Sequence, residues 1–470
     1  MWLAKAGSST DLTCRPQDLT AGNQNRCRVD YTDSPILTDR TDSAHDGVSD
    51  GKAPWRTLFR MDIGFSEGLL IVGALLVLAA GLSGWLHRTV LSIAVLSVLA
   101  GIVLSATGLV SVDPGAEIVL RVVEVALILT LFSDGLFVEG ELLRHAWGPA
   151  ARALAIAMPV TLVLLALAAK TLFAELGWAE AFLLGAVLSP TDPVVTSSVV
   201  TSARVPPIIR HTLNLESGLN DGLALPFVLF FLVLATNSGN AAGEAARLGG
   251  EALVGAAIGV GLAILGGWLL SRLPRPGITH KYEGIYALGI AFAAFGLADV
   301  THGNGLIAAF VAGIALAVTR HEIPDAFSTF NESVSAAFQV ITFFVFGALI
   351  VATGWDGNTP ALVAFIAFAL LVARPAAVWL SLLGVPSLSW PEKAFAAWFG
   401  PKGVASMLFA LLVLSSTAPH RTMLFDVAAF AIIVSIMAHG LTDTLGANWI
   451  ERAIGRRTAH DERGPSRHAT

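Results

Sequence analysis

The chain has 470 residues, of which 54% are hydrophobic and only 14% are charged, and its mean hydropathy is +0.70. A soluble protein of ordinary composition carries about 25% charged residues, so this composition excludes a soluble globular fold. The formal net charge of −6 is small, and no basic patch suits nucleic acid. Cys14 and Cys27 show neither metal-site spacing nor a disulfide framework.

Residues 1–66 form a polar N-terminal tail rich in Asp, Ser, Thr and Arg, without helical or strand periodicity. The tail has no apolar core of a signal peptide. Two interpretations remain open: a disordered tail, or a true translation start at Met61, just before the first apolar run.

Apolar stretches of roughly 20 residues then follow one another, each long enough to cross about 30 Å of hydrocarbon as a helix. The sequence predicts an all-α integral membrane protein. Its thirteen transmembrane spans are predicted at about 68–86, 90–111, 117–137, 149–173, 179–200, 206–236, 245–271, 282–301, 303–319, 331–352, 359–384, 392–416 and 423–443. The membrane domain is expected at 67–445, followed by a short cytoplasmic tail at 446–470.

Lys and Arg residues lie mainly in the loops after odd-numbered spans and in the C-terminal tail. The positive-inside rule therefore predicts a cytoplasmic C-terminus and, with thirteen spans, an external N-terminus. Arg56 and Arg60 beside the first span would violate that rule, which favours the start at Met61.

Helix-breaking residues lie deep within two spans. Span five contains Pro190 and Pro193, and span twelve contains Gly400, Pro401 and Gly403. Proline removes a backbone donor and breaks a helix, and the freed groups at membrane depth need protein or water partners. Seven spans separate the two breaks, so they have opposite orientations, as in transporters with inverted repeats. Two unrelated proline kinks are the alternative.

Ionisable residues within apolar spans are functional candidates because they are costly in a membrane. Here they are Asp134 in span three, Asp192 in the break of span five, Glu216 and Asp221 in span six, Arg374 in span eleven and Lys402 in the break of span twelve. Asp134 is expected near the cytoplasmic rim, as part of a funnel or as a solvated helix end. His439 is expected at an interface because it lies near the end of span thirteen.

Span six places two pairs of polar residues four apart, so that each pair shares one helix face. The pairs are Glu216 with Asn220, and Ser217 with Asp221. A hard cation prefers carboxylate, hydroxyl and carbonyl oxygens. The predicted ligands are Asp221, Ser217, Asp192 and the freed carbonyl groups around Thr191. Because neighbouring carboxylates repel each other, such a site can hold either a cation or protons, and this competition is sufficient for exchange. The alternative for either aspartate is a buried side chain satisfied by hydrogen bonds.

The positive residues have structural roles in this interpretation. Glu216 and Arg374 are expected to form a buried ion pair between spans six and eleven. Lys402 is expected opposite Asp192, with its ammonium group at the negative C-terminal end of a half-helix.

At these residues the sequence resembles cation:proton antiporter family 1, which comprises the prokaryotic (NhaP-like) sodium/proton antiporters and the eukaryotic sodium/proton exchangers. The matching motifs are SPTDPV (189–194), ESGLND (216–221), ARP (373–375) and GPKG (400–403), in family order. The resemblance covers roughly residues 65–445.

The resemblance implies a thirteen-helix homodimer with a mobile core domain that moves like an elevator. It implies that Asp221 is the central ion- and proton-binding carboxylate, with Asn220 beside it and an oxygen from Ser217. Thr191 and Asp192 would lie at the crossing of two broken helices. The Asn220–Asp221 pair resembles the electroneutral branch, and Lys402 stands where many members have Arg.

The expected function is therefore secondary antiport of a monovalent cation, Na⁺ first and K⁺ as the alternative, for protons across the cell membrane. No cofactor and no enzymatic activity are expected. One alternative is a cation channel or a sensor with the same body. A remote alternative is an intramembrane aspartyl protease using Asp192 and Asp221, but the chain lacks the Gly-x-Gly-Asp pattern of that chemistry.

Overall fold

A computed structural model describes residues 65–86, 93–113, 116–137, 147–192, 202–236, 241–272, 280–319 and 323–461. Within these ranges the regular elements are helices, and no strand is present. The polar tail with its cysteines, the start at Met61 and Pro193 lie outside the described residues.

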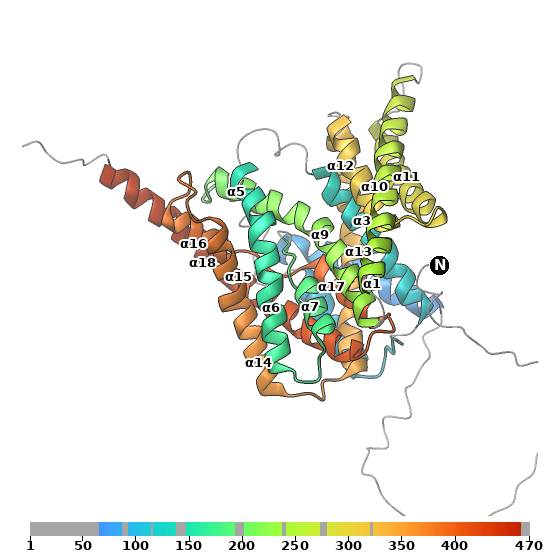
Figure 1. Cartoon of the computed structure of the whole chain (residues 1–470), viewed down its shortest axis with the longest axis horizontal. Helices are drawn as coiled ribbons and strands as arrows, with labels where there is room; N and C mark the ends of the chain where they lie inside the picture. The colour runs from blue at the N-terminus through green and yellow to red at the C-terminus, as the bar shows by residue number, and fades with distance from the viewer. Residues whose placement is uncertain are drawn as a thin grey trace, which may run out of the picture. The chain divides into compact units, whose positions relative to one another are not determined.

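Figure 1 labels most of the described helices. In order they are α1 (Phe65–Leu86), α2 (Ile93–Ala106), α3 (Glu117–Phe137), α5 (Trp147–Arg152), η3 (Ala153–Ala157), α6 (Met158–Leu172), α7 (Trp178–Val187), α9 (Pro207–Thr236), α10 (Ala241–Arg272), α11 (His280–Val300), α12 (Gly305–Thr319), α13 (Ile323–Thr353), α14 (Thr359–Phe368), η5 (Ala369–Ala373), α15 (Arg374–Ser381), α16 (Trp390–Trp398), α17 (Val404–Leu414) and α18 (Arg421–Asp461).

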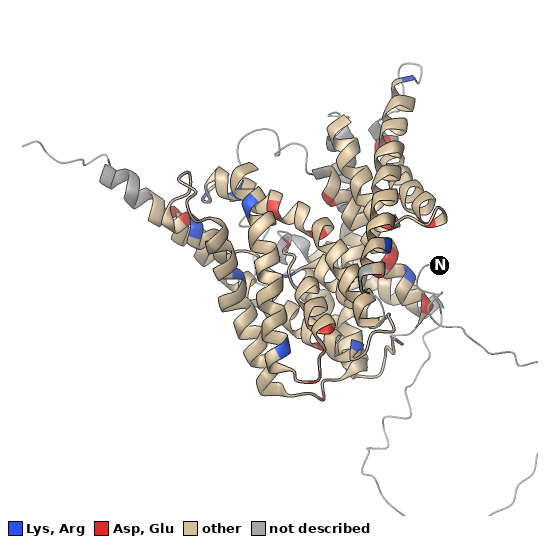
Figure 2. Cartoon of the chain, in the orientation of Figure 1, with Lys and Arg blue, Asp and Glu red and all other residues tan. Residues whose placement is uncertain are grey.

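Every predicted span overlaps a described helix, and charged residues are sparse along the ribbons (Figure 2). Seven helical segments among the described residues are long and apolar enough to cross a membrane, and five shorter apolar helices accompany them. The all-helical membrane fold is thus confirmed, whereas the count of thirteen spans stays a prediction. Apart from the two predicted breaks, the largest differences at a boundary are that α13 begins at Ile323 instead of about 331 and that α18 continues to Asp461 instead of ending near 443. No proline interrupts α18, so its helix runs on beyond the apolar stretch.

The closely spaced spans eight and nine are two separate helices, α11 and α12. Asn304 begins α12: its side-chain oxygen accepts the backbone N–H of Ile307 at 2.9 Å, while its own N–H donates to the carbonyl of Glu251 at 2.8 Å. A side-chain cap of this kind satisfies an orphan donor at a helix start. The turn is therefore held by α10 as well as by its own cap.

Helix packing relies on small residues. α12 packs against α3, α10 and α11 through a largely alanine core, and α13 packs along α2. A second core joins parts of α9, α15, α16 and α18. α9 also contacts both α3 and α7. Small residues let membrane helices approach closely, and this packing places α3 and α7 against α9, the helix that carries Asp221.

The fourth and eleventh predicted spans share an irregularity. In each, a π-helical turn is followed by a proline as the second residue of the next helix: η3 precedes Pro159, and η5 precedes Pro375. Proline cannot donate the regular helical bond, which favours a wider turn. In the eleventh span this turn ends directly before Arg374.

The fifth and twelfth predicted spans begin with the same kind of capped helical turn. In α7, a side-chain oxygen of Glu180 accepts the N–H of Gly177 at 2.5 Å, and in α16 Glu392 accepts the N–H of Ser389 at 2.7 Å. Each glutamate thus reaches back to the residue that begins its helix, as in a capping box. Spans four and five thus contain a π-helical turn, a proline and then a capped half-helix, and spans eleven and twelve contain the same features in the same order. This correspondence supports an internal repeat.

Candidate functional site

The two predicted breaks meet through their backbones. α7 ends at Val187 and the chain is non-helical up to Asp192, while α16 ends at Trp398 and α17 begins at Val404. The N–H of Asp192 donates to the carbonyl of Pro401 at 2.9 Å. Backbone groups that leave a helix at membrane depth need such partners, so each break satisfies part of the other.

Asp192 lies at the N-terminus of α17. Its Oδ2 accepts the N–H of Val404, the first residue of that helix, at 2.9 Å. A carboxylate there satisfies an orphan donor and meets the positive end of the helix dipole. A Cβ atom at Gly403 would collide with this carboxylate, so only glycine permits the approach. The structure therefore gives Asp192 a capping role.

Lys402 interacts with the end of a helix, whereas Asp192 interacts with the start of one. Its Nζ is 3.4 Å from the carbonyl of Ser189 and 3.3 Å from that of Pro190, just beyond the end of α7, and the side chain is buried. The ammonium group meets carbonyls at the negative end of a helix. The acid of one break thus holds the start of α17, and the base of the other holds the end of α7.

Asn220 ties α9 to the same region. Its Nδ2 donates to the carbonyl of Thr191 at 3.1 Å and to the hydroxyl of Thr191 at 2.8 Å. Asn220 and Ser217 are buried, and Ser217 lies one helical turn before Asp221. The amide nitrogen of Asn220 thus helps to fix the conformation of the backbone at Thr191, in the first break.

Asp221 on α9 lies beside Asp134 on α3. The two helices pack against each other, and the backbone of α3 at Asp134 lies against Gly218, three residues before Asp221. Among the described residues, Oδ1 of Asp221 and Oδ2 of Asp134 are buried and meet no hydrogen-bond donor. Two carboxylates in this position need a proton or a cation between them.

Asp134 lies where α3 packs against other helices, and its expected place near the cytoplasmic rim stays a prediction. α3 packs against both α9 and α12, and the carbonyl of Asp134 comes within 3.7 Å of a Cβ built on Gly218. This close approach of α3 brings the side chain to the central acid. The sequence could not show it, because the position within a span does not tell which helix lies opposite.

Glu216 and Arg374 are in contact. Nη1 of Arg374 donates to Oε1 of Glu216 at 2.9 Å, and both side chains are about 7% exposed. The pair joins α9 to α15. Each charge is buried, so each depends on the other for its stability.

His439 lies beside the second break. Its side chain is 3% exposed, and its expected place near a membrane interface stays a prediction. Its Nε2 lies 2.9 Å from the carbonyl of Trp398, the last residue of α16. The ring also packs on the Trp398 indole, with centroids 5.3 Å apart. The available signal was Ser435, four residues earlier on the same helix face.

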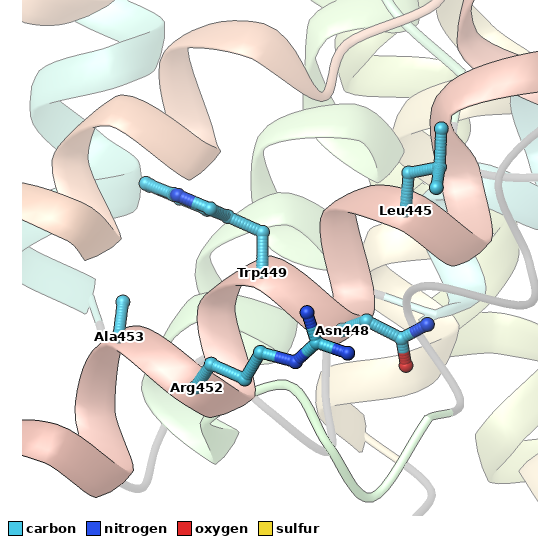
Figure 3. Close-up of a pocket in the computed structure, with 5 residues that line it drawn as sticks. All are labelled: Leu445, Asn448, Trp449, Arg452 and Ala453. Carbon is cyan, nitrogen blue, oxygen red and sulfur yellow. The ribbon is translucent and has the colours of Figure 1, made fainter.

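Within the described part of the chain, no group of three or more His, Cys, Asp or Glu residues has the arrangement of a resident metal site. A separate surface pocket lies along α18 (Figure 3). It is lined by Leu445, Asn448, Trp449, Arg452 and Ala453. None of the acidic site residues lines it, so the carboxylates beside the breaks are the candidate site.

Several proteins are similar to this chain in sequence. The chain is 27% identical over 347 residues to a K(+)/H(+) antiporter NhaP of Alkalimonas amylolytica, covering 73% of this chain and 59% of the relative. It is 26% identical over 327 residues to the K(+)/H(+) antiporter NhaP2 of Shewanella oneidensis, covering 68% and 56%. It is 24% identical over 374 residues to a Na(+)/H(+) antiporter of Schizosaccharomyces pombe, covering 70% and 77%. The chain thus spans less than two thirds of the two bacterial relatives.

The fold is that of a solved structure, the sodium proton antiporter MjNhaP1 from Methanocaldococcus jannaschii at pH 8. The TM-score is 0.65 at 22% identity, covering 82% of this chain and 97% of that one. The family model "Sodium/hydrogen exchanger, transmembrane" matches residues 71–445, which include both breaks and all the acidic site residues. The chain therefore belongs to the sodium/hydrogen exchanger family, a family of membrane transporters and not of enzymes.

Proposed function

We propose that this protein exchanges a monovalent cation for protons, and that Asp221 is the group that binds both in turn. The carrying observation is a pair of buried carboxyl oxygens on helices that pack against each other: Oδ1 of Asp221 on α9 and Oδ2 of Asp134 on α3, neither of which meets a donor within the described residues. A proton between the two groups satisfies them in one state. A cation held by Asp221 satisfies them in the other.

The proposed cation ligands surround Asp221. They are Asp221 itself, Asp192, the hydroxyl of Ser217 and the oxygens of Thr191, with Asn220 as the residue that orients Thr191. Hard cations take such oxygen ligands. Asp192 accepts a bond from Val404 through Oδ2, and it is proposed to contribute to the cation site from the N-terminus of α17.

The oxygen ligands suit both Na⁺ and K⁺. Na⁺ is the first candidate because the matching family model is that of sodium/hydrogen exchangers, and K⁺ is the second because the bacterial relatives are named K(+)/H(+) antiporters. One cation replacing one proton on one carboxylate moves no net charge. We therefore propose electroneutral exchange, with elevator-type alternating access in a homodimer of the cell membrane and a cytoplasmic C-terminus.

The test is proton movement in everted membrane vesicles, followed with a pH-sensitive dye and titrated with Na⁺, K⁺ and Li⁺ in turn. Dequenching that saturates with at least one cation is expected. Collapse of the membrane potential should leave its initial rate unchanged. No response to any cation would contradict exchange, and a steady current in a planar bilayer would contradict electroneutrality and favour a channel.

A further inference from the structure

The break of the twelfth span interrupts one particular helical hydrogen bond. In a continuous helix, the N–H of Lys402 would donate to the carbonyl of Trp398, four residues earlier. In the structure α16 ends at Trp398 and residues 399–403 are non-helical. The N–H of Lys402 and the carbonyl of Trp398 therefore lose their regular helical partners at the break. Buried backbone groups without hydrogen-bond partners are costly.

α18 supplies a partner to each of these two groups. The N–H of Lys402 donates to Oγ of Ser435 at 2.9 Å. The carbonyl of Trp398 lies 2.9 Å from Nε2 of His439. Ser435 and His439 are themselves in contact, with Oγ 3.3 Å from Nδ1. The two side chains thus span the gap that the missing helical bond leaves.

The two ring nitrogens of His439 face backbone carbonyl groups on opposite sides of the ring. Nε2 faces the carbonyl of Trp398, and Nδ1 lies 2.7 Å from the carbonyl of Ser435. A carbonyl oxygen only accepts, so a neutral ring donates to one of the two carbonyls at a time, and the proton on Nε2 is the one that satisfies Trp398. The Ser435 hydroxyl oxygen accepts from the N–H of Lys402 with the proton on either nitrogen.

Two further contacts from the same helix face hold this region. The indole nitrogen of Trp398 donates to the hydroxyl of Thr442 at 3.0 Å, and a Cβ atom at Gly446 would collide with the ring of Phe399. Residues 435, 439, 442 and 446 share one stripe of α18 by their spacing. That stripe therefore follows the broken helix from Lys402 back to Phe399 and Trp398.

We infer that His439, together with Ser435, is a positioning element that replaces the lost Lys402-to-Trp398 helical bond and so sets the geometry of the ion site. The break that it shapes carries Lys402 to the end of α7 and Gly403 to the carboxylate of Asp192. His439 does not touch the cation. The inference rests on the proposed exchange function for its effect on transport, but not for its effect on the break.

The transport test compares three variants of the full chain. His439→Phe keeps the ring on Trp398 but removes both nitrogens, and we expect the half-saturating cation concentration to rise about tenfold, the equivalent of one buried hydrogen bond. His439→Gln can donate to Trp398 and accept from Ser435, so it should recover most of the loss. His302→Asn, at an exposed turn residue with a positive φ of 59°, is the matched control and should behave as wild type.

The structural test is deuterium uptake by the peptide covering residues 398–404, measured by mass spectrometry on the whole protein. Ser435→Ala and His439→Phe should each speed uptake there and not in α11, and the double variant should add little to either. Unchanged uptake in both single variants would overturn the inference, as would equal transport by His439→Phe and wild type. A wild-type protein without cation-driven proton movement would instead overturn the proposed function, and uptake would still decide the positioning role.

Discussion

The guanidinium group of Arg374 lies directly on the backbone of Gly400, so that a Cβ atom at position 400 would collide with Nε, Cζ and Nη2 of the arginine. Gly400, in the second break, thus packs directly against the arginine of the Glu216–Arg374 ion pair. The break and the ion pair are one packed unit, although they lie on different predicted spans.

Gly400→Ala should therefore damage the protein through the arginine. We expect a loss of about 3 kcal/mol, the size of a disrupted buried charge pair, seen as a lower melting temperature of the detergent-solubilised protein. Gly289→Ala in α11 is the matched control, because nothing lies within 4 Å of its added Cβ atom. Equal melting temperatures for the two variants would contradict the close approach.

The ion pair itself should show strong coupling between its members. Arg374→Met and Glu216→Leu are each expected to destabilise by about 3–5 kcal/mol, because each leaves one buried charge alone. The double variant removes both charges and should lose less than the sum. A double-mutant cycle on thermal unfolding measures this, and strict additivity would show that the two groups do not depend on each other.

Asp221→Asn should abolish cation-driven proton movement in everted vesicles while leaving expression unchanged. The amide has the same shape but can neither hold a proton in exchange nor neutralise a cation. Glu124→Gln is the control: Glu124 is a carboxylate on α3 that pairs with Arg121 at 2.9 Å and is partly exposed. Undiminished exchange by Asp221→Asn would remove Asp221 from the central role.

Lys402 tests the reciprocal capping of the two breaks. Lys402→Gln loses the positive charge beside the carbonyls of Ser189 and Pro190 and should lower the exchange rate at least tenfold. Lys402→Arg keeps the charge but has a larger planar head in a buried space, so we expect partial activity. Initial rates at saturating cation separate the two, and equal rates would show that the charge is not needed.

The sequence by itself determined the class of the protein and singled out most of the candidate site residues. The composition and the length of the apolar stretches specified a helical membrane protein. A stretch of about 20 apolar residues is long enough to cross the membrane, and as a helix it satisfies its own backbone hydrogen bonds there. Helix breakers and buried charges are rare and costly in membranes, so Asp192, Asp221 and Lys402 stand out from the sequence pattern alone. The spacing of four within α9 was also readable, since it depends only on helical geometry.

The tertiary structure alone decided how these residues are paired. Asp134 lies beside Asp221 because α3 packs closely against α9, and His439 reaches Trp398 because α18 follows the break of the twelfth span. Neither contact could be predicted from the sequence, which shows how far along its own helix a residue lies but not which helix faces it. That choice follows from the packing of small residues between helices far apart in the chain, a cooperative property that no local pattern records.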